Sequence, residues 1–161
     1  MFRVDDRLIH GQVAVMWSKE LAIKRIIVAS DVVAANPIQV SALKMAAPEG
    51  IKAAVLPVDK AAEILNDPRS DAMNILVLSN TPDDLLRLIR QIGERSVMDV
   101  ANYGRIGGGG LSDKKKISET VYLTEKDEDV LRQIADLGVE LIHQPLPGDP
   151  RLELIKLMEG K

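Results

Sequence analysis

The sequence predicts an α/β protein built on an open, mostly parallel twisted sheet, with helices on both faces and less buried strands at its C-terminal edge. Apolar runs of strand length alternate with helical patterns along nearly the whole chain, an order that produces parallel sheets. Hydrophobic residues make up 46% of the chain and aromatic residues only 2%, so the core must be aliphatic, as in sheets buried on both faces. We find no internal repeat and no long linker, so residues 1–161 are expected to form a single domain.

Seven segments read as strands, because each is a short run rich in aliphatic residues. In chain order they are residues 2–4, 25–30, 51–56, 74–78, 96–100, 117–123 and 139–142. The run 117–123 alternates apolar and polar side chains, which indicates a less buried strand.

Six segments between and after these strands read as helices. They cover residues 13–21, 37–46, 60–65, 82–92, 125–138 and 150–158. Asn36 is placed to cap the second helix, with Pro37 at its first position. Thr81 opens the fourth helix with a capping-box pattern and a following proline. Thr124 precedes the fifth helix, and Gly138 is a suitable residue to end it.

The composition excludes several classes of protein. A net charge of −3 supplies neither a basic surface for nucleic acid nor a polybasic membrane patch. The lack of cysteine excludes disulfides, thiolate catalysis and cysteine-ligated metals, and the two histidines lie far apart in sequence. We therefore expect no cofactor and no metal. No apolar run approaches the roughly 20 residues of a transmembrane helix, and the start lacks a signal-peptide pattern, so a cytoplasmic, non-spanning protein is expected.

The most informative segment joins the first strand to the first helix, where Asp5, Asp6, Arg7 and His10 fall within six positions. In open α/β sheets ligands bind beyond the carboxyl ends of the strands, and this loop often borders that crevice. Histidine is substantially neutral at cytoplasmic pH, so a ring nitrogen can attack phosphorus. We interpret His10 as a nucleophile that carries a phosphoryl group, with Asp5 or Asp6 as the acceptor that orients its ring.

Three neighbours of His10 are suited to bind a phosphoryl group. Arg7 offers a planar fork of donors that matches phosphate oxygens. Gly11 lets the backbone approach a ligand closely. The helix that starts soon after Gln12 offers unpaired N–H groups and the positive end of its dipole. The segment therefore combines a nucleophilic imidazole with a cradle for an anion.

The same segment carries a family resemblance that extends over essentially the full chain. The matching stretches are R-V-D-D-R-L-I-H-G-Q-V at residues 3–13, R-I-I-V-A-S-D-V-V-A at 25–34, A-A-P-E-G at 46–50, Asn102-x-Gly104, Thr124-x-Lys126-Asp127 and L-G-V-E-L at 137–141. Together they resemble the IIB subunits of the mannose/sorbose-type phosphoenolpyruvate-dependent sugar phosphotransferase system. The first stretch is eleven residues long, which makes it far more specific than a single glycine motif.

The resemblance implies that the chain is a transferase and that His10 receives a phosphoryl group on Nδ1 from a phosphohistidine of a IIA domain. It implies that the group then passes to a sugar held by the membrane IIC and IID subunits, and that Arg7 contacts it. After Gly104 the chain departs from the family pattern, because Arg105, Ile106 and four glycines follow.

Four further features have weaker signals. His143 follows a late strand and precedes two prolines, and we expect a structural or surface role. The run Gly107–Gly110 lacks the Lys-Ser/Thr ending of a phosphate loop and is expected to be a surface loop. Ser79 ends the fourth strand, where it can reach the crevice or serve in a turn. The lysines at 114–116 read as a solvated turn or as a docking site for acidic partners.

Two other functions are compatible with parts of the sequence. A receiver domain phosphorylated on aspartate would use Asp5 and Asp6 to hold magnesium. However, Asp59 falls late for the phosphorylated residue, and residues 98–104, around the end of the fifth strand, contain no lysine. A non-catalytic relative that only binds partners would have no need of the intact segment from Arg7 to Gly11.

A carrier must present His10 to two partners in turn. We therefore expect its ring to be exposed at the rim of the sheet's carboxyl edge. The interface with each partner is expected to bury less than roughly 1,200 Å². Leu8, Ile9, Met16 and Trp17 are the apolar residues expected to surround it, with core packing as the alternative for Trp17.

Overall fold

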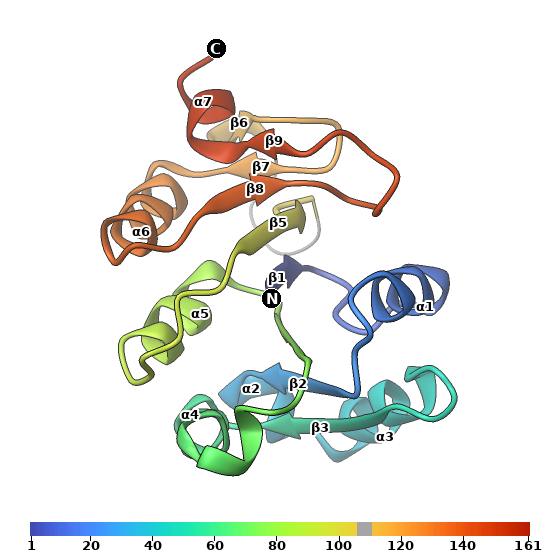
Figure 1. Cartoon of the computed structure of the whole chain (residues 1–161). Helices are drawn as coiled ribbons and strands as arrows, with labels where there is room; N and C mark the ends of the chain where they lie inside the picture. Colours follow the sequence, from blue (N-terminus) through green and yellow to red (C-terminus); the bar gives the residue numbers. More distant parts are fainter. Residues whose placement is uncertain (106–110) are drawn as a thin grey trace.

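The computed structural model describes residues 1–105 and 111–161 and contains the predicted sheet (Figure 1). The strands of the main sheet are, in spatial order, β3 (Lys52–Leu56), β2 (Arg25–Ala29), β4 (Ile75–Ser79), β1 (Phe2–Asp5), β5 (Met98–Asn102), β8 (Leu141–His143) and β9 (Leu152–Glu153). Neighbouring strands are parallel except β8 and β9, which are antiparallel. Both residues of β9 are exposed. The predicted fold class is confirmed.

Helices cover both faces of this sheet. They are α1 (Gly11–Glu20), α2 (Asp31–Ala34), α3 (Pro37–Ala46), α4 (Val58–Asn66), α5 (Pro82–Ile89), α6 (Glu125–Asp136) and α7 (Leu154–Met158), with short 3₁₀ turns at Pro68–Ser70 and Leu111–Asp113. Figure 1 shows α1 and α3 on one face, and α4, α5 and α6 on the other. The strands between them are therefore buried on two sides, which the aliphatic composition predicts.

The core consists of two aliphatic clusters, one on each face. The cluster on the α4–α6 face includes Val4, Ile27, Val77, Leu85, Leu88, Met98, Leu131 and Ile134. The cluster on the α1 and α3 face includes Leu8, Ile9, Ala14, Ile26, Val28, Val33, Leu43 and Leu76. Each buried Leu, Ile, Val or Met side chain contributes roughly 1.5–3 kcal/mol, so this packing is the main term that stabilises the fold.

Local capping signals set the helix ends as predicted. The Asn36 side chain accepts a hydrogen bond from the backbone of Gln39 at the start of α3, and Thr81 caps α5 in the same way. At the start of α6 a reciprocal capping box joins Thr124 and Asp127. Gly138 follows α6 with a φ of +93°, a conformation that favours glycine after a helix.

Two predicted elements are wrong in the C-terminal third of the chain. The strand expected over 117–123 is instead a small hairpin outside the main sheet, formed by β6 (Lys115–Lys116) and β7 (Tyr122–Leu123). A turn between them is closed by the amides of Ile117 and Ser118, which both bond to the Val121 carbonyl. The helix expected from residue 150 starts at Leu154, because the two residues before it pair with β8 as β9.

A register shift separates β1 from β5 near their carboxyl ends. Val4 pairs with Val100 and Asp5 pairs with Asn102, so Ala101 is an extra residue in β5. The Ala101 carbonyl accepts a hydrogen bond from Thr120 Oγ1 at 2.6 Å. This bulge brings Asn102 opposite Asp5, at the end of the strand that leads to His10.

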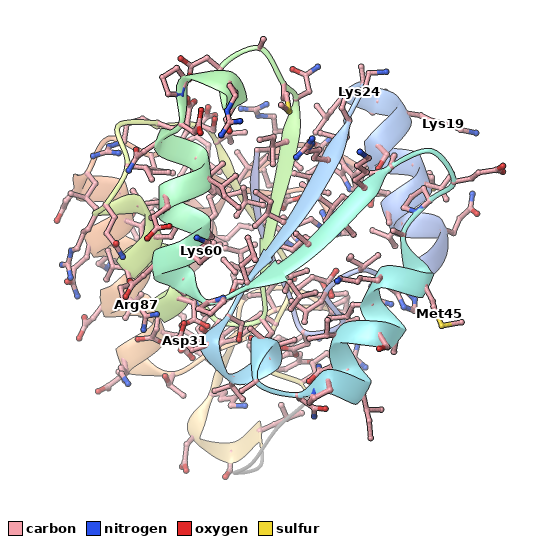
Figure 2. The ribbon with its side chains drawn as sticks, turned by 90° about the horizontal axis from the view of Figure 1, so that it is seen from below. Lys19, Lys24, Asp31, Met45, Lys60 and Arg87 are labelled. Atoms are coloured by element: carbon pink, nitrogen blue, oxygen red, sulfur yellow. The ribbon has the colours of Figure 1, made fainter. Side chains whose placement is uncertain are left out.

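Asp31 ties three helices together at the carboxyl edge of the sheet. Its carboxylate lies 2.6 Å from Arg87 Nη2 of α5 and accepts a bond of 2.8 Å from the amide of Val58 in α4. Figure 2 shows Asp31 and Arg87 side by side at this edge. The Arg87 hydrogen bond is the main cause that holds the pKa of Asp31 below its ordinary value. Because both side chains are about half exposed, the pair contributes at most about 1 kcal/mol.

The described part of the chain contains no helix that is both long enough and apolar enough to cross a membrane.

Candidate active site

His10 lies at the carboxyl edge of the sheet and is exposed, as expected of a carrier residue. It is the N-cap residue of α1, with extended backbone angles, and its side chain makes no capping hydrogen bond with the described residues. The helix starts at Gly11, two positions earlier than predicted, so Gly11 and Gln12 form its first turn. Gly11 has a φ of +33°, which a residue with a Cβ rarely adopts. His10 thus directly precedes the first-turn amides of α1, which have no acceptor within the helix.

The loop that carries His10 is anchored from below by apolar side chains. Leu8 and Ile9 are each only 4% exposed and belong to the cluster on the α1 and α3 face. Trp17 is equally buried, and Met16 is half-buried. The prediction that Leu8 and Ile9 surround His10 at the surface is therefore wrong, and for Trp17 the core-packing alternative is correct. Their apolar area is used to hold the loop and α1 against the sheet.

Arg7 is half-exposed and is oriented by Asp5. The Asp5 Oδ1 atom accepts a hydrogen bond from the Arg7 amide at 2.9 Å and lies 3.4 Å from Arg7 Nε. The Arg7 side chain is 38% exposed, so its guanidinium can meet a ligand at the surface. A guanidinium held through Nε can present its two terminal amino groups to phosphate oxygens.

Asp5 is fully buried. Besides Arg7, it accepts a hydrogen bond of 3.3 Å from Asn102 Nδ2 and forms an ion pair of 3.5 Å with Arg3. Asp6 accepts a hydrogen bond of 3.0 Å from the amide of Gly104. The structure thus links Asp5 to Arg7, whereas the assignment of either aspartate as the group that orients His10 stays a prediction.

These contacts explain the Asn102-x-Gly104 pattern, whose role the sequence left open. Asn102 bonds to Asp5, and Gly104 bonds to Asp6. Gly104 has a φ of +90°, and a Cβ there would lie 1.9 Å from the Tyr122 carbonyl oxygen. Only glycine allows this close approach, so the end of β5 fixes both aspartates of the His10 loop.

The remaining candidates have structural contacts. Ser79 is buried, and its Oγ accepts a bond of 3.4 Å from the Thr81 amide, which is a turn role. His143 is buried, with Nδ1 2.7 Å from the Val100 carbonyl, so this nitrogen is the donor. Lys114 donates to the Gly104 carbonyl at 2.7 Å. The run Gly107–Gly110 lies outside the described residues.

The sequence reading missed two charged residues below the loop. Arg3 and Asp99 form a buried ion pair of 2.6 Å. Both lie within apolar runs that we read as ordinary buried strands. The available signal was the charge itself, because a charged side chain in the middle of such a strand needs a partner.

Comparison with known proteins supports the predicted family. The chain matches the family described as "PTS system sorbose subfamily IIB component" over residues 1–161. A probable phosphotransferase enzyme IIB component of Streptococcus pyogenes serotype M6 is 33% identical, over 97% of this chain and 96% of that protein. The mannose-specific EIIAB component of the phosphotransferase system of Escherichia coli K12 is 34% identical over 97% of this chain, which spans 47% of that protein's length.

Solved structures agree with the sequence matches. The IIBSor domain of the sorbose permease from Klebsiella pneumoniae superposes with a TM-score of 0.90 at 28% identity, covering 100% of this chain and 96% of that one. The N-acetylgalactosamine-specific IIB component 1 from Escherichia coli gives a TM-score of 0.81 at 27% identity, covering 94% and 95%.

These findings define the class of protein: a phosphoryl-transfer subunit of the sugar phosphotransferase system, a transferase that serves sugar transport. The chain belongs to the mannose/sorbose family of IIB components. The receiver-domain and non-catalytic alternatives are not favoured.

Proposed function

We propose that residues 1–161 act as one IIB domain in which His10 carries the phosphoryl group. It accepts this group from a phosphohistidine of a IIA domain in the cytoplasm and passes it to a sugar during uptake through membrane IIC and IID subunits. The observation that carries the proposal is the exposed position of His10 at the start of α1, in the same loop as a half-exposed Arg7. Relatives named for mannose, sorbose and fructose, and solved structures named for N-acetylgalactosamine, support a hexose or an amino-hexose as the sugar.

Each half-reaction exchanges one bond to phosphorus for another. In the first, a His10 ring nitrogen attacks phosphorus, and the P–N bond to the donor histidine breaks. In the second, a sugar hydroxyl oxygen attacks, the P–N bond to His10 breaks, and the hydroxyl proton leaves to a base. Charge is spread over the equatorial oxygens of the group during transfer, so Arg7 and the first-turn amides of α1 stabilise it where it develops.

Phosphorylation with defined components tests the site. Incubation with phosphoenolpyruvate, the general phosphotransferase proteins and a IIA partner should add one phosphoryl group to the wild-type chain. The His10→Ala variant should take up none. His143→Gln is the matched control and should be labelled fully, because His143 is buried on β8. Full labelling of His10→Ala would overturn the assignment.

The stability of the label separates the alternatives. A phosphoryl group on histidine is lost in acid and retained in alkali, whereas an aspartyl phosphate is lost in both. A chain that only binds partners takes up no label under these conditions. We expect an acid-labile, alkali-stable label.

A further inference from the structure

A buried network of charges lies beneath the loop that carries His10. Arg3 of β1 stands directly opposite Asp99 of β5, and their side chains meet at 2.6 Å between Nη1 and Oδ2. Both residues are at most 2% exposed, and so is Asp5. Burying these charges is costly compared with an apolar pair of the same size. Stability alone therefore gives no reason for their presence in the sheet.

One branch of the network leads to Arg7. Arg3 Nη2 lies 3.5 Å from Asp5 Oδ2. Among the described residues this Oδ2 atom has no hydrogen-bond donor, so the charge of Arg3 is what holds it. The other carboxylate oxygen of Asp5 binds the Arg7 amide and lies against Arg7 Nε. The position of the Arg7 guanidinium thus depends on Arg3 through one shared carboxylate.

The other branch leads to α1. The Arg3 guanidinium lies over the Trp17 ring, with its Cζ 5.6 Å from the ring centroid. Arg3 Nη2 and Trp17 Nε1 donate to the same acceptor, the Pro145 carbonyl, at 2.9 and 3.0 Å. Asp99 holds the turn that supplies this carbonyl, because its Oδ1 accepts the amide of Gln144 at 2.9 Å. Trp17 lies in the second turn of the helix that starts beside His10.

The two branches meet at one guanidinium. Arg3 contacts the residue that orients Arg7 and the residue that seats α1, and Asp99 is its closest charge partner. We propose that the Arg3–Asp99 pair positions the phosphoryl-binding group relative to the nucleophile: it fixes Arg7 against the His10 end of α1. The proposal rests on the proposed function of His10 and adds Arg3 and Asp99 as positioning residues that do not touch the phosphoryl group.

A double-mutant cycle on the full chain tests this role. Arg3→Lys keeps the charge but loses the fork that reaches Asp99, Asp5 and Pro145 together. Because a misplacement of about 1 Å can cost on the order of 10²-fold in rate, we expect transfer from phosphorylated IIA to slow roughly 10- to 100-fold. In an Arg7→Lys background the same substitution should slow transfer by less than about threefold further, since coupled residues are not additive.

Asp99→Asn is the second variant. It keeps an oxygen for the Gln144 amide but places an amino group where Oδ2 accepts from Arg3, so it removes both the charge and the acceptor that hold Arg3. It should therefore slow transfer in the same direction and again lose its effect in the Arg7→Lys background. Ile134→Val, a buried change in α6, is the control for stability. It should lower the melting temperature and leave the transfer rate unchanged.

The outcomes separate this proposal from the proposed function. The positioning role would be overturned if a double variant lost the full product of the rate losses of its two single variants, Arg7→Lys and either Arg3→Lys or Asp99→Asn. It would also be overturned if both Arg3→Lys and Asp99→Asn transferred at the wild-type rate. Either result would leave the His10 assignment intact, provided that His10→Ala takes up no label. Rapid labelling of His10→Ala would instead overturn the function on which the proposal rests.

Discussion

At the scale of single residues, Arg7 is the side chain whose chemistry is most easily separated from the fold. Its guanidinium is half-exposed and held by one carboxylate, so a substitution there disturbs little packing. Arg7→Lys keeps the positive charge and loses the bidentate fork. Removal of one such transition-state contact commonly costs on the order of 10²–10³ in rate. We expect this loss in rapid-quench measurements of both half-reactions, with little change in melting temperature.

Arg25→Lys is a suitable control for this experiment, because Arg25 is exposed at the opposite, amino end of β2. It should transfer at the wild-type rate. Arg7 would be reduced to an ordinary loop residue if Arg7→Lys also transferred at that rate in both directions.

Gly104 supports a prediction about stability. Gly104→Ala would force a Cβ to 1.9 Å from the Tyr122 carbonyl oxygen at a φ of +90°. The positive φ alone costs about 1–3 kcal/mol, and the clash adds to it. We expect a loss of more than about 2 kcal/mol in the free energy of unfolding, measured in urea.

Gly93→Ala is the matched control, because nothing lies within 4 Å of a Cβ at that position. It should change stability by less than about 1 kcal/mol. Equal effects of the two substitutions would show that the close approach at Gly104 carries no energetic weight.

Asp99 gives the fold a defined dependence on pH. Burial raises the pKa of its carboxyl from 3.8 to about 6, and the charge of Arg3 opposes this shift. Since the folded chain binds this proton more tightly than the unfolded chain, ionisation of Asp99 lowers stability as the pH rises through this window. Asp99→Asn has no such cost. The free energy of unfolding of Asp99→Asn minus that of wild type should therefore increase by about 1–3 kcal/mol from pH 4 to pH 7.

Thermal or urea unfolding of both proteins at the two pH values measures this change. Other titrating groups are shared by the two chains and cancel in the difference. A difference that is the same at both pH values would mean that Asp99 titrates as it does in the unfolded chain.

At the scale of elements, the sequence predicts those features that depend on neighbours along the chain. The caps at Asn36, Thr81 and Thr124 were correct, because each is a contact within a few residues. The strand over 117–123 was wrong because its alternating pattern competes with a local turn, in which the Thr120 amide bonds to Ser118 Oγ. β9 was missed because its pairing partner lies about ten residues back in β8, and no local signal marks it.

The same distinction applies to the site. His10 and Arg7 could be proposed because their chemistry is concentrated in one short loop at a predictable edge of the sheet. The burial of Leu8 and Trp17 could not be decided from the sequence, since an apolar residue next to a site is compatible with a docking surface and with a core equally well. The role of Asp99 also required the structure, because its partner Arg3 is 96 positions away in sequence.

The capping box of α6 provides a test at this scale. Thr124→Ala removes the side chain that accepts from the Asp127 amide and leaves that amide without its cap. We expect a loss of about 1 kcal/mol in the free energy of unfolding. Lys126→Ala, an exposed change in the same turn, should stay within about 0.5 kcal/mol of wild type. A loss of equal size in both variants would contradict the capping role.

At the scale of the whole molecule, the two edges of the sheet differ in what they offer a partner. His10 stands at the carboxyl edge, whereas a cleft of about 650 Å³ opens at the amino edge between residues such as Met1, Asn74 and Glu94. A carrier needs brief encounters, so the IIA interface should be small, below roughly 1,200 Å². Titration with a IIA domain should shift amide NMR signals in fast exchange around His10 and Gln12. Shifts confined to the amino-edge cleft would contradict docking at the carboxyl edge.

The extra residue in β5 makes the site depend on the length of the chain as well as on its chemistry. Deleting Ala101 would remove one methyl group and no charge. The deletion would close the bulge and leave Asn102 opposite Asp5, because Asn102 would then directly follow Val100, the partner of Val4. It would, however, remove the carbonyl that accepts from Thr120 Oγ1 and ties β5 to the turn before β7. A one-codon deletion that leaves every charged residue in place would therefore loosen the hairpin that lies against Gly104, the residue whose amide holds Asp6.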